Sequence, residues 1–269
     1  MPERILKETF IQLLKQQHGP IKYYNELQLL DLYQDEQVQC FITDSGSMYY
    51  VLERRQSPIN KFDSWVKVFW NSGIDQDVLD YFSEHQDYLI ISHDLELANG
   101  YHLIDTYEYF YRKVCPDKSL GQPLELDAKV KSLWELPTES KLIIPNNGDD
   151  PVAWLLQLEI DTFDPKENNI FYCEVDGRLV AVCSIAREEM IDLIPVVRVS
   201  NVYTVPEYRR NGYAITTILF GLNELIKEET YLFYDVGMAL TNIASSRLAE
   251  KLGLMKYGTS YIYQKSQMD

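Results

Sequence analysis

The sequence predicts an α+β protein, because short strands joined by tight turns alternate with amphipathic helices in both halves of the chain. One strand hairpin is predicted in each half: Val38–Thr43 with Met48–Leu52, and Ile170–Val175 with Leu179–Ala186. The second hairpin turns at Asp176-Gly177, a dipeptide typical of two-residue hairpin loops. The order of the first half (two helices, a hairpin, a strand, a helix and a strand) resembles the order that follows residue 151.

Each remaining element follows from its hydrophobic period and its flanking turn residues. The predicted helices cover residues 4–17, 23–33, 75–84, 126–136, 151–160, 215–226 and 243–252. The other predicted strands cover residues 65–70, 88–92, 101–114, 194–205, 231–236 and 257–264. We expect the first helix to end before His18-Gly19-Pro20, and Gly253 to end the last one.

The two halves are joined by a segment rich in residues that break regular structure. It contains prolines at positions 116, 123, 137 and 145 and ends in Asn-Asn-Gly-Asp-Asp at residues 146–150. A chain of 269 residues is long enough for two ordinary domains. We therefore predict an N-terminal α+β domain over residues 1–125, a connection over 126–150 and a second domain over 151–269.

Charge is the abnormal feature of the composition, because 25 Lys and Arg face 41 Asp and Glu, which gives a formal net charge of −16. Such a surface repels a phosphate backbone, so we expect no nucleic-acid partner. It favours encounter with cationic amines, although acidic surfaces also occur merely for solubility.

The sequence carries no signal for a membrane, for secretion or for a metal. No apolar run approaches the roughly 18 residues that a membrane-spanning helix needs. The N-terminus carries acidic residues and lacks the apolar centre of a secretory signal. Cys40, Cys115, Cys173 and Cys183 lie far apart, as is typical of reduced thiols rather than of metal ligands. We therefore expect a cytoplasmic protein with no metal and no membrane partner.

The segment 201–214 is the part of the sequence that indicates chemistry. A strand ends at Val205, a loop with Arg209 and Arg210 follows, and an apolar helix begins near Gly212. The start of a helix offers unpaired backbone N–H groups and the positive end of the helix dipole to an anion. Gly212 lacks a Cβ, which allows the backbone to approach a bulky anion closely. These features predict a pyrophosphate-binding loop, which is neither a Walker loop nor a dinucleotide fingerprint because neither glycine spacing occurs.

The loop sequence Arg-Arg-Asn-Gly-Tyr-Ala at residues 209–214 resembles the acyl-CoA motif of the GCN5-related N-acetyltransferase (GNAT) superfamily, Arg/Gln-x-x-Gly-x-Gly/Ala. Residues 202–208 look like the strand that precedes this motif, and residues 242–254 are similar to the second signature of the family. The amino-acid sequences of both segments resemble those of the FR47-like subgroup. The resemblance covers residues 151–269 and implies a GNAT fold there, with a mixed, mostly antiparallel central sheet flanked by helices.

The resemblance also implies acetyl-CoA as co-substrate and the residues that bind it. The strands 194–205 and 231–236 should splay, and the backbone of Val202, Tyr203 and Thr204 would pair with the pantetheine arm. An N–H near Thr204 would polarise the thioester oxygen. The other expected CoA-binding residues are Arg209, Arg210, Asn211, Gly212, Tyr213, Ala214 and Asn242. Asn242 would also cap the helix that follows it.

Relatives transfer the acyl group directly from CoA to an amine, so the amine must lose a proton and the thiolate must gain one. Ala249 stands where relatives often place a tyrosine general acid, so that assignment fails here. We select Tyr257 and Ser245 as candidate acids and Asp235 as the candidate carboxylate for proton removal or substrate binding. The further candidates are Tyr203, Tyr213, Tyr261, Tyr263 and Glu159, whereas Cys173 and Cys183 are expected to be packed inside.

Two questions stay open at the level of sequence. The N-terminal domain is either a degenerate GNAT copy that does not bind CoA, with Asp75 and Asp77 at the helix start that corresponds to Gly212, or an unrelated α+β cap. The leading function is an N-acetyltransferase that moves acetyl from acetyl-CoA to an amine of a small molecule or peptide. The alternative is a catalytically degenerate CoA-binding regulatory or interaction protein, which Ala249 favours.

Overall fold

The structure is a computed structural model of the chain and describes residues 2–32, 34–53, 64–83, 88–97, 100–115, 128–132, 168–191, 193–237 and 239–265. The chain forms two compact units. Unit 1 comprises Met1–Tyr109, Val236–Ile243 and Tyr257–Asp269, and unit 2 comprises Phe110–Asp235 and Ala244–Lys256. These units share most of their residues with the two predicted domains. The boundaries of those domains, at 1–125, 126–150 and 151–269, stay a prediction.

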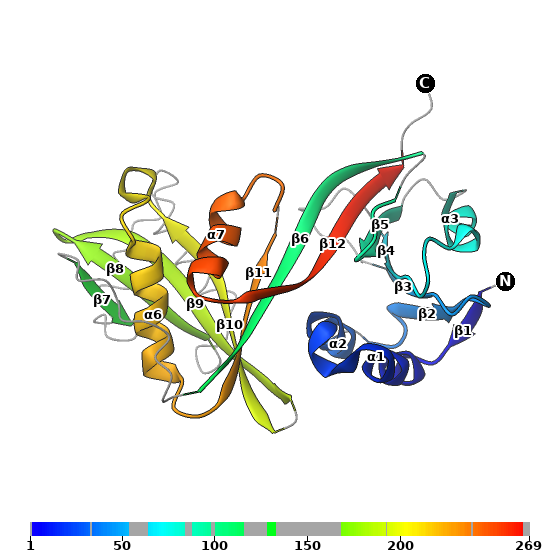
Figure 1. Cartoon of the computed structure of the whole chain (residues 1–269), viewed down its shortest axis with the longest axis horizontal. Helices are drawn as coiled ribbons and strands as arrows, with labels where there is room; N and C mark the ends of the chain where they lie inside the picture. Colours follow the sequence, from blue (N-terminus) through cyan, green and yellow to red (C-terminus); the bar gives the residue numbers. More distant parts are fainter. Residues whose placement is uncertain are drawn as a thin grey trace. The chain divides into compact units, whose positions relative to one another are not determined.

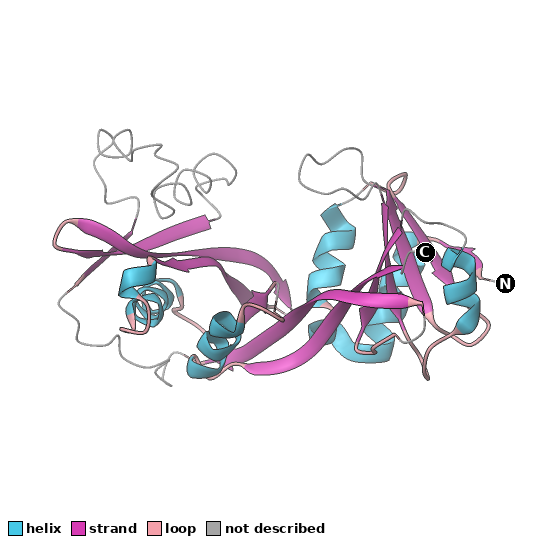
Figure 2. Cartoon of the chain, turned by 90° about the horizontal axis from the view of Figure 1, so that it is seen from above, coloured by secondary structure: helices cyan, strands magenta, loops and turns pink. Residues whose placement is uncertain are grey.

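Unit 1 is a mixed sheet with helices on both faces (Figures 1 and 2). Its helices are α1 (Lys7–Lys22), α2 (Tyr24–Leu32) and α3 (Gln76–Ser83). Its strands are β1 (Glu3–Ile5), β2 (Val38–Ile42), β3 (Met48–Glu53), β4 (Ser64–Phe69), β5 (Tyr88–His93), most of β6 (Tyr101–Val114) and most of β12 (Met255–Lys265). The strand order is β1-β2-β3-β4-β5-β12-β6, with a parallel β4–β5 pair.

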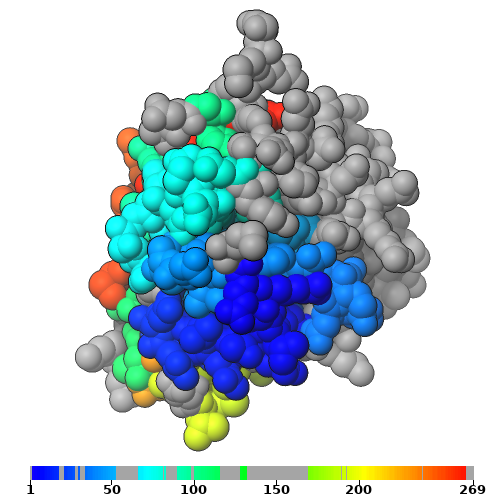
Figure 3. Space-filling model, turned by 90° about the vertical axis from the view of Figure 1, so that its right-hand side faces the viewer, coloured from blue at the N-terminus to red at the C-terminus, as the bar shows by residue number. Residues whose placement is uncertain are grey.

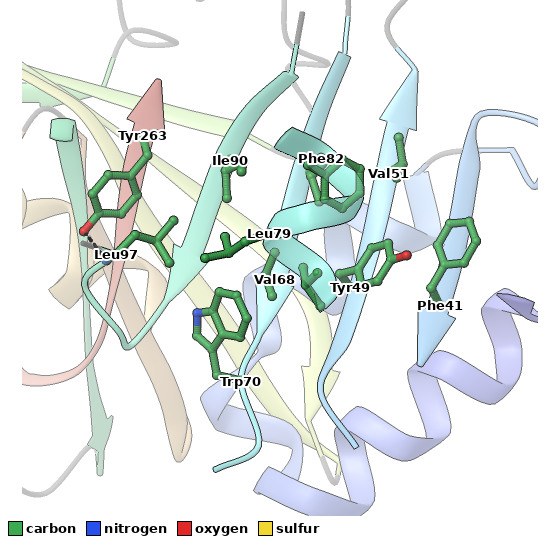
Figure 4. Packing of buried hydrophobic residues seen from close by; sticks show 12 residues of the cluster. Phe41, Tyr49, Val51, Val68, Trp70, Leu79, Phe82, Ile90, Leu97 and Tyr263 are labelled. Atoms are coloured by element: carbon green, nitrogen blue, oxygen red, sulfur yellow. Dashed lines mark hydrogen bonds between the residues drawn. The ribbon is translucent and has the colours of Figure 1, made fainter. Parts of the chain in front are cut away.

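The two faces of this sheet hold two separate cores, as expected when side chains alternate along a strand. On β3, Tyr49 and Val51 join the core under α3, which is drawn in Figure 4 and also contains Trp70. The next residues, Tyr50 and Leu52, join the core under α1 and α2. Residues of α1 (dark blue) and of α3 (cyan) accordingly lie on opposite sides of the lighter blue strand residues in Figure 3.

Unit 2 also contains a mixed set of paired strands. Its strands are β7 (Lys129–Ser132), β8 (Asn168–Val175), β9 (Arg178–Ile191), β10 (Ile194–Thr204), β11 (Thr230–Val236) and the end of β6, in the order β6-β11-β10-β9-β8-β7. The helical elements are α6 (Tyr213–Leu225), α7 (Ile243–Lys251) and the short 3₁₀ helix η2 (Pro206–Tyr208). Helix α6 packs closely on β8 and β9 (Figure 1), because a Cβ added to Gly221 would lie 2.5 Å from the ring of Phe171.

Most predicted elements are confirmed, including both hairpins and the turn at Asp176-Gly177, where both residues have positive φ. The predicted end of the first helix is wrong, because α1 continues to Lys22. The extra turn brings Tyr23 against Phe69 and His93, with ring centroids 5.0 and 4.8 Å apart, so packing outweighs the unfavourable Gly-Pro pair.

The predicted helix over 126–136 is also wrong where it can be judged, because its described residues include the strand β7. Ala128 and Val130 pack beside β8 and β9, so a sheet edge decides the structure of this short segment. The predicted helix over 151–160, and with it Glu159, lies outside the described residues.

All four cysteines are free, and Cys173 and Cys183 are buried, as predicted. Cys40, for which no burial was predicted, is buried as well. Burial raises the pKa of Cys173 to about 11, which keeps this thiol protonated and unreactive at neutral pH.

Among the helices of the described ranges, none is long and apolar enough to cross a membrane.

Candidate functional site

The parallel strands β10 and β11 part in the middle of unit 2. Their ladder pairs Val196 with Tyr231 and ends where Val199 pairs with Tyr234. The rest of β10, through Thr204, stays paired with β9 only. The backbone edge of Val202, Tyr203 and Thr204 that faces away from β9 is therefore free of a neighbouring strand, as the expected splay requires.

A β-bulge reshapes β10 at this point. Ser200 pairs with Ser184, and Tyr203 pairs with Val182. Between these two pairs β10 therefore contains one residue more than β9, which is a β-bulge. Asn201 lies in the bulge with φ +49°, a left-handed conformation that asparagine tolerates better than most residues. The bulge bends β10 away from the course of β11 directly after the last shared pair.

The predicted pyrophosphate-binding loop leads from β10 through η2 into α6. Arg210 and Gly212 have φ values of +68° and +88°, and Gly212 is the N-cap of α6. The Asn211 side chain donates to the carbonyl oxygens of Tyr208 and Arg209, both at 3.3 Å. Asn211 therefore holds the shape of the loop. Positive φ values at the alternate residues Arg210 and Gly212 turn backbone N–H groups towards one side.

The first turn of α6 leaves donors for an anion. Gly212 gives no side-chain cap, and the first turn contains no acidic residue. The N–H groups of Tyr213 and Ala214 have no carbonyl one turn earlier in the helix. The buried hydroxyl of Thr216 also lacks a hydrogen-bond partner among the described residues. These donors, at the positive end of the helix dipole, fit the diphosphate of CoA.

Three exposed arginines, Arg178, Arg209 and Arg210, add positive charge near this turn. Arg209 Nε donates to the Thr204 carbonyl at 3.0 Å, and its guanidinium lies 5.7 Å from the centroid of the Tyr203 ring. In the described part of the chain, none of the three forms an ion pair with a carboxylate. Unpaired arginines are notable in a chain with a net charge of −16.

Asp235 lies on β11 one residue beyond the last pair with β10. Arg198 of β10 donates to its carboxylate and also binds Glu188 of β9, at 3.0 Å from Nη2 to Oε2. The three side chains are mostly buried and tie three strands together. Sequence reasoning selected Asp235 but missed Arg198 and Glu188, because no local pattern links residues so far apart in the chain.

The other catalytic candidates have partners of their own. Ser245 of α7 lies 3.3 Å from the hydroxyl of Tyr234, whose pKa burial raises. Tyr257 is in unit 1, where its hydroxyl accepts a hydrogen bond from Asn25 at 3.4 Å. Asp235 and Ser245 thus share unit 2 with the predicted loop, whereas Tyr257 does not.

The α7 segment supplies two further positions of interest. Asn242, also in unit 1, precedes α7 and lies with its amide 3.5 Å from the Gly237 carbonyl. The side chain of Ala249 is fully buried in α7. The described residues contain no group of three His, Cys, Asp or Glu side chains that could hold a metal ion.

In unit 1 a helix, α3, likewise connects two neighbouring parallel strands, β4 and β5, but the local chemistry differs. The parallel pair β4–β5 remains together through Phe69 and His93, so these strands do not part. At the start of α3, Asp75 accepts a hydrogen bond from the Asp77 N–H at 3.1 Å and another from Ser45. Burial raises the pKa of Asp75, but these hydrogen bonds outweigh it and hold the pKa below its ordinary value. A carboxylate therefore occupies the helix start that is uncapped in unit 2.

Unit 1 also contains a buried ion pair between its sheet and a helix. Lys67 of β4 binds Glu26 of α2, and both side chains are at least 94% buried. Lys67 Nζ also lies 3.4 Å from the Tyr109 hydroxyl, which hydrogen-bonds Ser260 at 3.0 Å. His93 stacks on Tyr109, with the ring planes 3° apart. This cluster could not be predicted from local patterns, because a lysine in an alternating strand is usually solvent-facing.

Comparison with known proteins establishes the fold as that of the GNAT acetyltransferases. The chain aligns over 100% of its length with 97% of a GCN5-related N-acetyltransferase from Sphaerobacter thermophilus, at a TM-score of 0.56 and 13% identity. It also aligns over 98% of its length with 97% of a tandem GNAT protein from the clavulanic acid biosynthesis pathway, at a TM-score of 0.54 and 11% identity.

A third similar structure is a functionally unknown conserved protein from Staphylococcus epidermidis. The alignment covers 83% of this chain and 92% of that one, at a TM-score of 0.50 and 12% identity. No family model and no curated protein matches the sequence. At such identities the likeness defines the fold, and function must be argued from the site itself.

Proposed function

We propose that the chain is an acyl-CoA-dependent N-acetyltransferase of the GNAT superfamily, with its CoA site in unit 2. The reaction moves acetyl from acetyl-CoA directly to an amine of a small molecule or peptide, in the cytoplasm. The FR47-like subgroup remains our assignment from the residues of the two motifs. The observation that carries the proposal is the parting of β10 and β11 after Val199 and Tyr234, followed directly by the uncapped start of α6.

Each part of the site has its own task in this proposal. The free edge of β10 at Val202, Tyr203 and Thr204 binds the pantetheine amides, and an N–H near Thr204 stabilises the developing oxyanion. The turn from Arg209 to Ala214 binds the diphosphate through backbone N–H groups and arginine side chains. Contact of Asn242 with the pantetheine arm stays a prediction from the sequence motif, because this residue belongs to unit 1.

The acceptor side uses Asp235 as a binding group for the amine. Arg198 binds this carboxylate in an ion pair and fixes it in place, an arrangement that suits attraction of an ammonium group better than proton removal. Ser245 remains the candidate acid for the departing thiolate within unit 2, whereas Tyr257, in unit 1, stays a candidate from sequence alone. Direct attack by the amine on the thioester needs positioning above all, and positioning alone can supply much of the rate enhancement.

We propose further that unit 1 is a degenerate copy of the same fold. The central strands of both units carry a cation between two valines, Val66-Lys67-Val68 and Val197-Arg198-Val199, each beside a parallel strand. The likeness to a tandem GNAT protein over nearly the whole chain supports a duplication. The closed β4–β5 pair and the Asp75 carboxylate support the view that this copy binds no CoA.

A CoA-binding regulatory or interaction protein without catalysis is the second candidate. Two observations favour it: the buried Ala249 in place of a tyrosine acid, and the ion pair that occupies Asp235. An intact CoA site alone would satisfy this function.

Calorimetric titration with CoA tests the site, and thiol release from acetyl-CoA across a panel of amines tests the reaction. We expect Arg210→Glu and Gly212→Asp to abolish CoA binding, because each places negative charge against the diphosphate. Gly212→Ala is the matched control for backbone strain at φ +88°. Unchanged CoA affinity in both charged variants would refute the site. CoA binding without thiol release for any amine would favour the regulatory candidate.

A further inference from the structure

Arg178 has no assigned task in the site described above. It begins β9, directly after the Asp176-Gly177 turn, and its side chain is exposed. Its guanidinium lies 5.7 Å from the centroid of the Tyr208 ring. The Tyr208 ring in turn meets the ring of Tyr213, the first residue of α6, at 5.9 Å and at 65°. One aromatic side chain thus separates Arg178 from the helix start that the CoA diphosphate is proposed to occupy.

The tyrosine pair fixes Arg178 in this position. Tyr208 and Tyr213 pack on the cluster of Cys173, Val180 and Ala181. A ring held in this way gives the Arg178 guanidinium a cation–π contact, while the N–H groups of the guanidinium stay available for a ligand. The nearest acidic side chain of β8, Glu174, is engaged by Lys131 at 3.3 Å, and no described carboxylate forms an ion pair with Arg178.

CoA carries two separate groups of negative charge. The diphosphate is attached to the 5′ carbon of the adenosine ribose, and a phosphomonoester is attached to the 3′ carbon of the same ribose. A site that reads both needs two positive centres, separated by about the width of a ribose. The loop at Arg209 and Arg210 supplies the first, and Arg178, whose guanidinium lies beside the ring of Tyr208, supplies the second.

Resting on the proposed CoA site, we infer that Arg178 binds the 3′-phosphate of CoA and makes the protein selective for free acyl-CoA. An acyl group on the phosphopantetheine arm of a carrier protein has no adenosine and no 3′-phosphate. Such a donor would leave Arg178 without a ligand. The donor chemistry is therefore the complete coenzyme thioester.

The test compares the affinities of CoA, 3′-dephospho-CoA and 4′-phosphopantetheine by calorimetry for the full-length protein. We expect the wild type to bind CoA about tenfold more tightly than 3′-dephospho-CoA, since a charge-assisted hydrogen bond to phosphate is typically worth that factor or more. Arg178→Ala should bind these two ligands equally, with the wild-type affinity for 3′-dephospho-CoA. Arg187→Ala, which removes another exposed arginine of the same strand, should keep the wild-type preference.

The outcomes separate this inference from the proposed CoA site. If the wild type binds none of the three ligands, the CoA site itself is wrong and the inference falls with it. If the wild type binds CoA and 3′-dephospho-CoA equally, the site stands and the 3′-phosphate contact is wrong. A preference that survives in Arg178→Ala overturns the assignment to Arg178. Equal binding of 4′-phosphopantetheine and CoA overturns the selectivity and favours a carrier-bound donor.

Discussion

Arg198 of β10 and Asp235 of β11 form an ion pair at the point where these two parallel strands stop pairing. Glu188 of β9 binds the same guanidinium, so one arginine links three neighbouring strands. The last backbone pair between β10 and β11 joins Val199 and Tyr234, the residues that follow Arg198 and precede Asp235. The side-chain pair therefore fixes the strands where their backbone ladder ends, and so defines where the gap between them begins.

Replacement of Arg198 should destabilise unit 2. Arg198→Met leaves two mostly buried carboxylates near each other without a cation, which we expect to cost about 2 kcal/mol of unfolding free energy. Urea unfolding measures this loss. The triple variant Arg198→Met, Glu188→Gln, Asp235→Asn should recover most of it, because no uncompensated charge remains. A single variant as stable as the wild type would show that the ion pairs contribute nothing.

Removal of the Glu26 carboxylate should destabilise unit 1 more strongly. Burial alone would raise the pKa of Glu26, but Lys67 and His93 together outweigh burial and hold this pKa below its ordinary value. Burial alone would likewise lower the pKa of Lys67, but Glu26 raises it. Glu26→Gln leaves a buried ammonium without its anion, which we expect to cost about 3–5 kcal/mol.

The pH dependence of this loss has a definite sign. Because the folded state lowers the pKa of Glu26, its contribution is complete above the unfolded value of about 4.3 and disappears as the pH falls through the folded pKa. The stability difference between wild type and Glu26→Gln should therefore be constant from about pH 5 to 8 and shrink in more acidic solution. Urea unfolding from about pH 8 down to below about pH 4 measures it, with Glu8→Gln, an exposed change in α1, as control. A difference that does not depend on pH would contradict the assignment.

Restoring the family tyrosine at residue 249 should fail for a packing reason. Ala249 is fully buried in α7, so Ala249→Tyr forces a large ring into a filled space and should cost about 1–3 kcal/mol or more. We expect a lower melting temperature and no gain in turnover. Glu250→Tyr, at the exposed neighbouring position, should keep the wild-type melting temperature. A stable Ala249→Tyr protein with raised kcat would show instead that the enzyme lacks an acid that a tyrosine can supply.

The sequence was informative where the signal is local. The Asp176-Gly177 turn, the period of α6 and the glycine at its start depend on neighbouring residues, and each was predicted within one or two positions. Helix α1 was misjudged because the packing of Tyr23 on Phe69 and His93 outweighs the local effect of Pro20. Local propensity cannot register such distant contacts.

The charged residues of the interior were missed for the same reason. Lys67 alternates with Val66 and Val68, a pattern that predicts a solvent-facing lysine. Helix α2 covers that face of the sheet and supplies Glu26, 41 positions away in the chain. The pairing of Arg198 with Asp235 spans 37 positions and likewise leaves no local trace.

The exchange of strands between the two halves of the chain could not be predicted from sequence. In unit 1 the strand beside β5 is β12, from the end of the chain, and in unit 2 the strand beside β11 is β6, from the first half. Within unit 2, Tyr111 of β6 stacks on Phe233 at 6.1 Å, and Arg112 donates to the Leu252 carbonyl at 3.2 Å. Within unit 1, the Tyr263 hydroxyl of β12 accepts a hydrogen bond from the Leu97 N–H at 2.9 Å. Each half of the chain thus completes the sheet of the other.

A fragment of residues 151–269, the predicted second domain, should therefore not fold by itself. It lacks β6, so β11 would become an edge strand with the buried Phe233 uncovered. Circular dichroism and urea unfolding should show no cooperative transition, and calorimetry no CoA binding. Mixing this fragment with residues 1–125, which supply β6 and receive β12, should restore both. A cooperative transition and CoA binding by the isolated 151–269 fragment would show that β6 is dispensable and that the domain boundary lies where the prolines of the connection indicate.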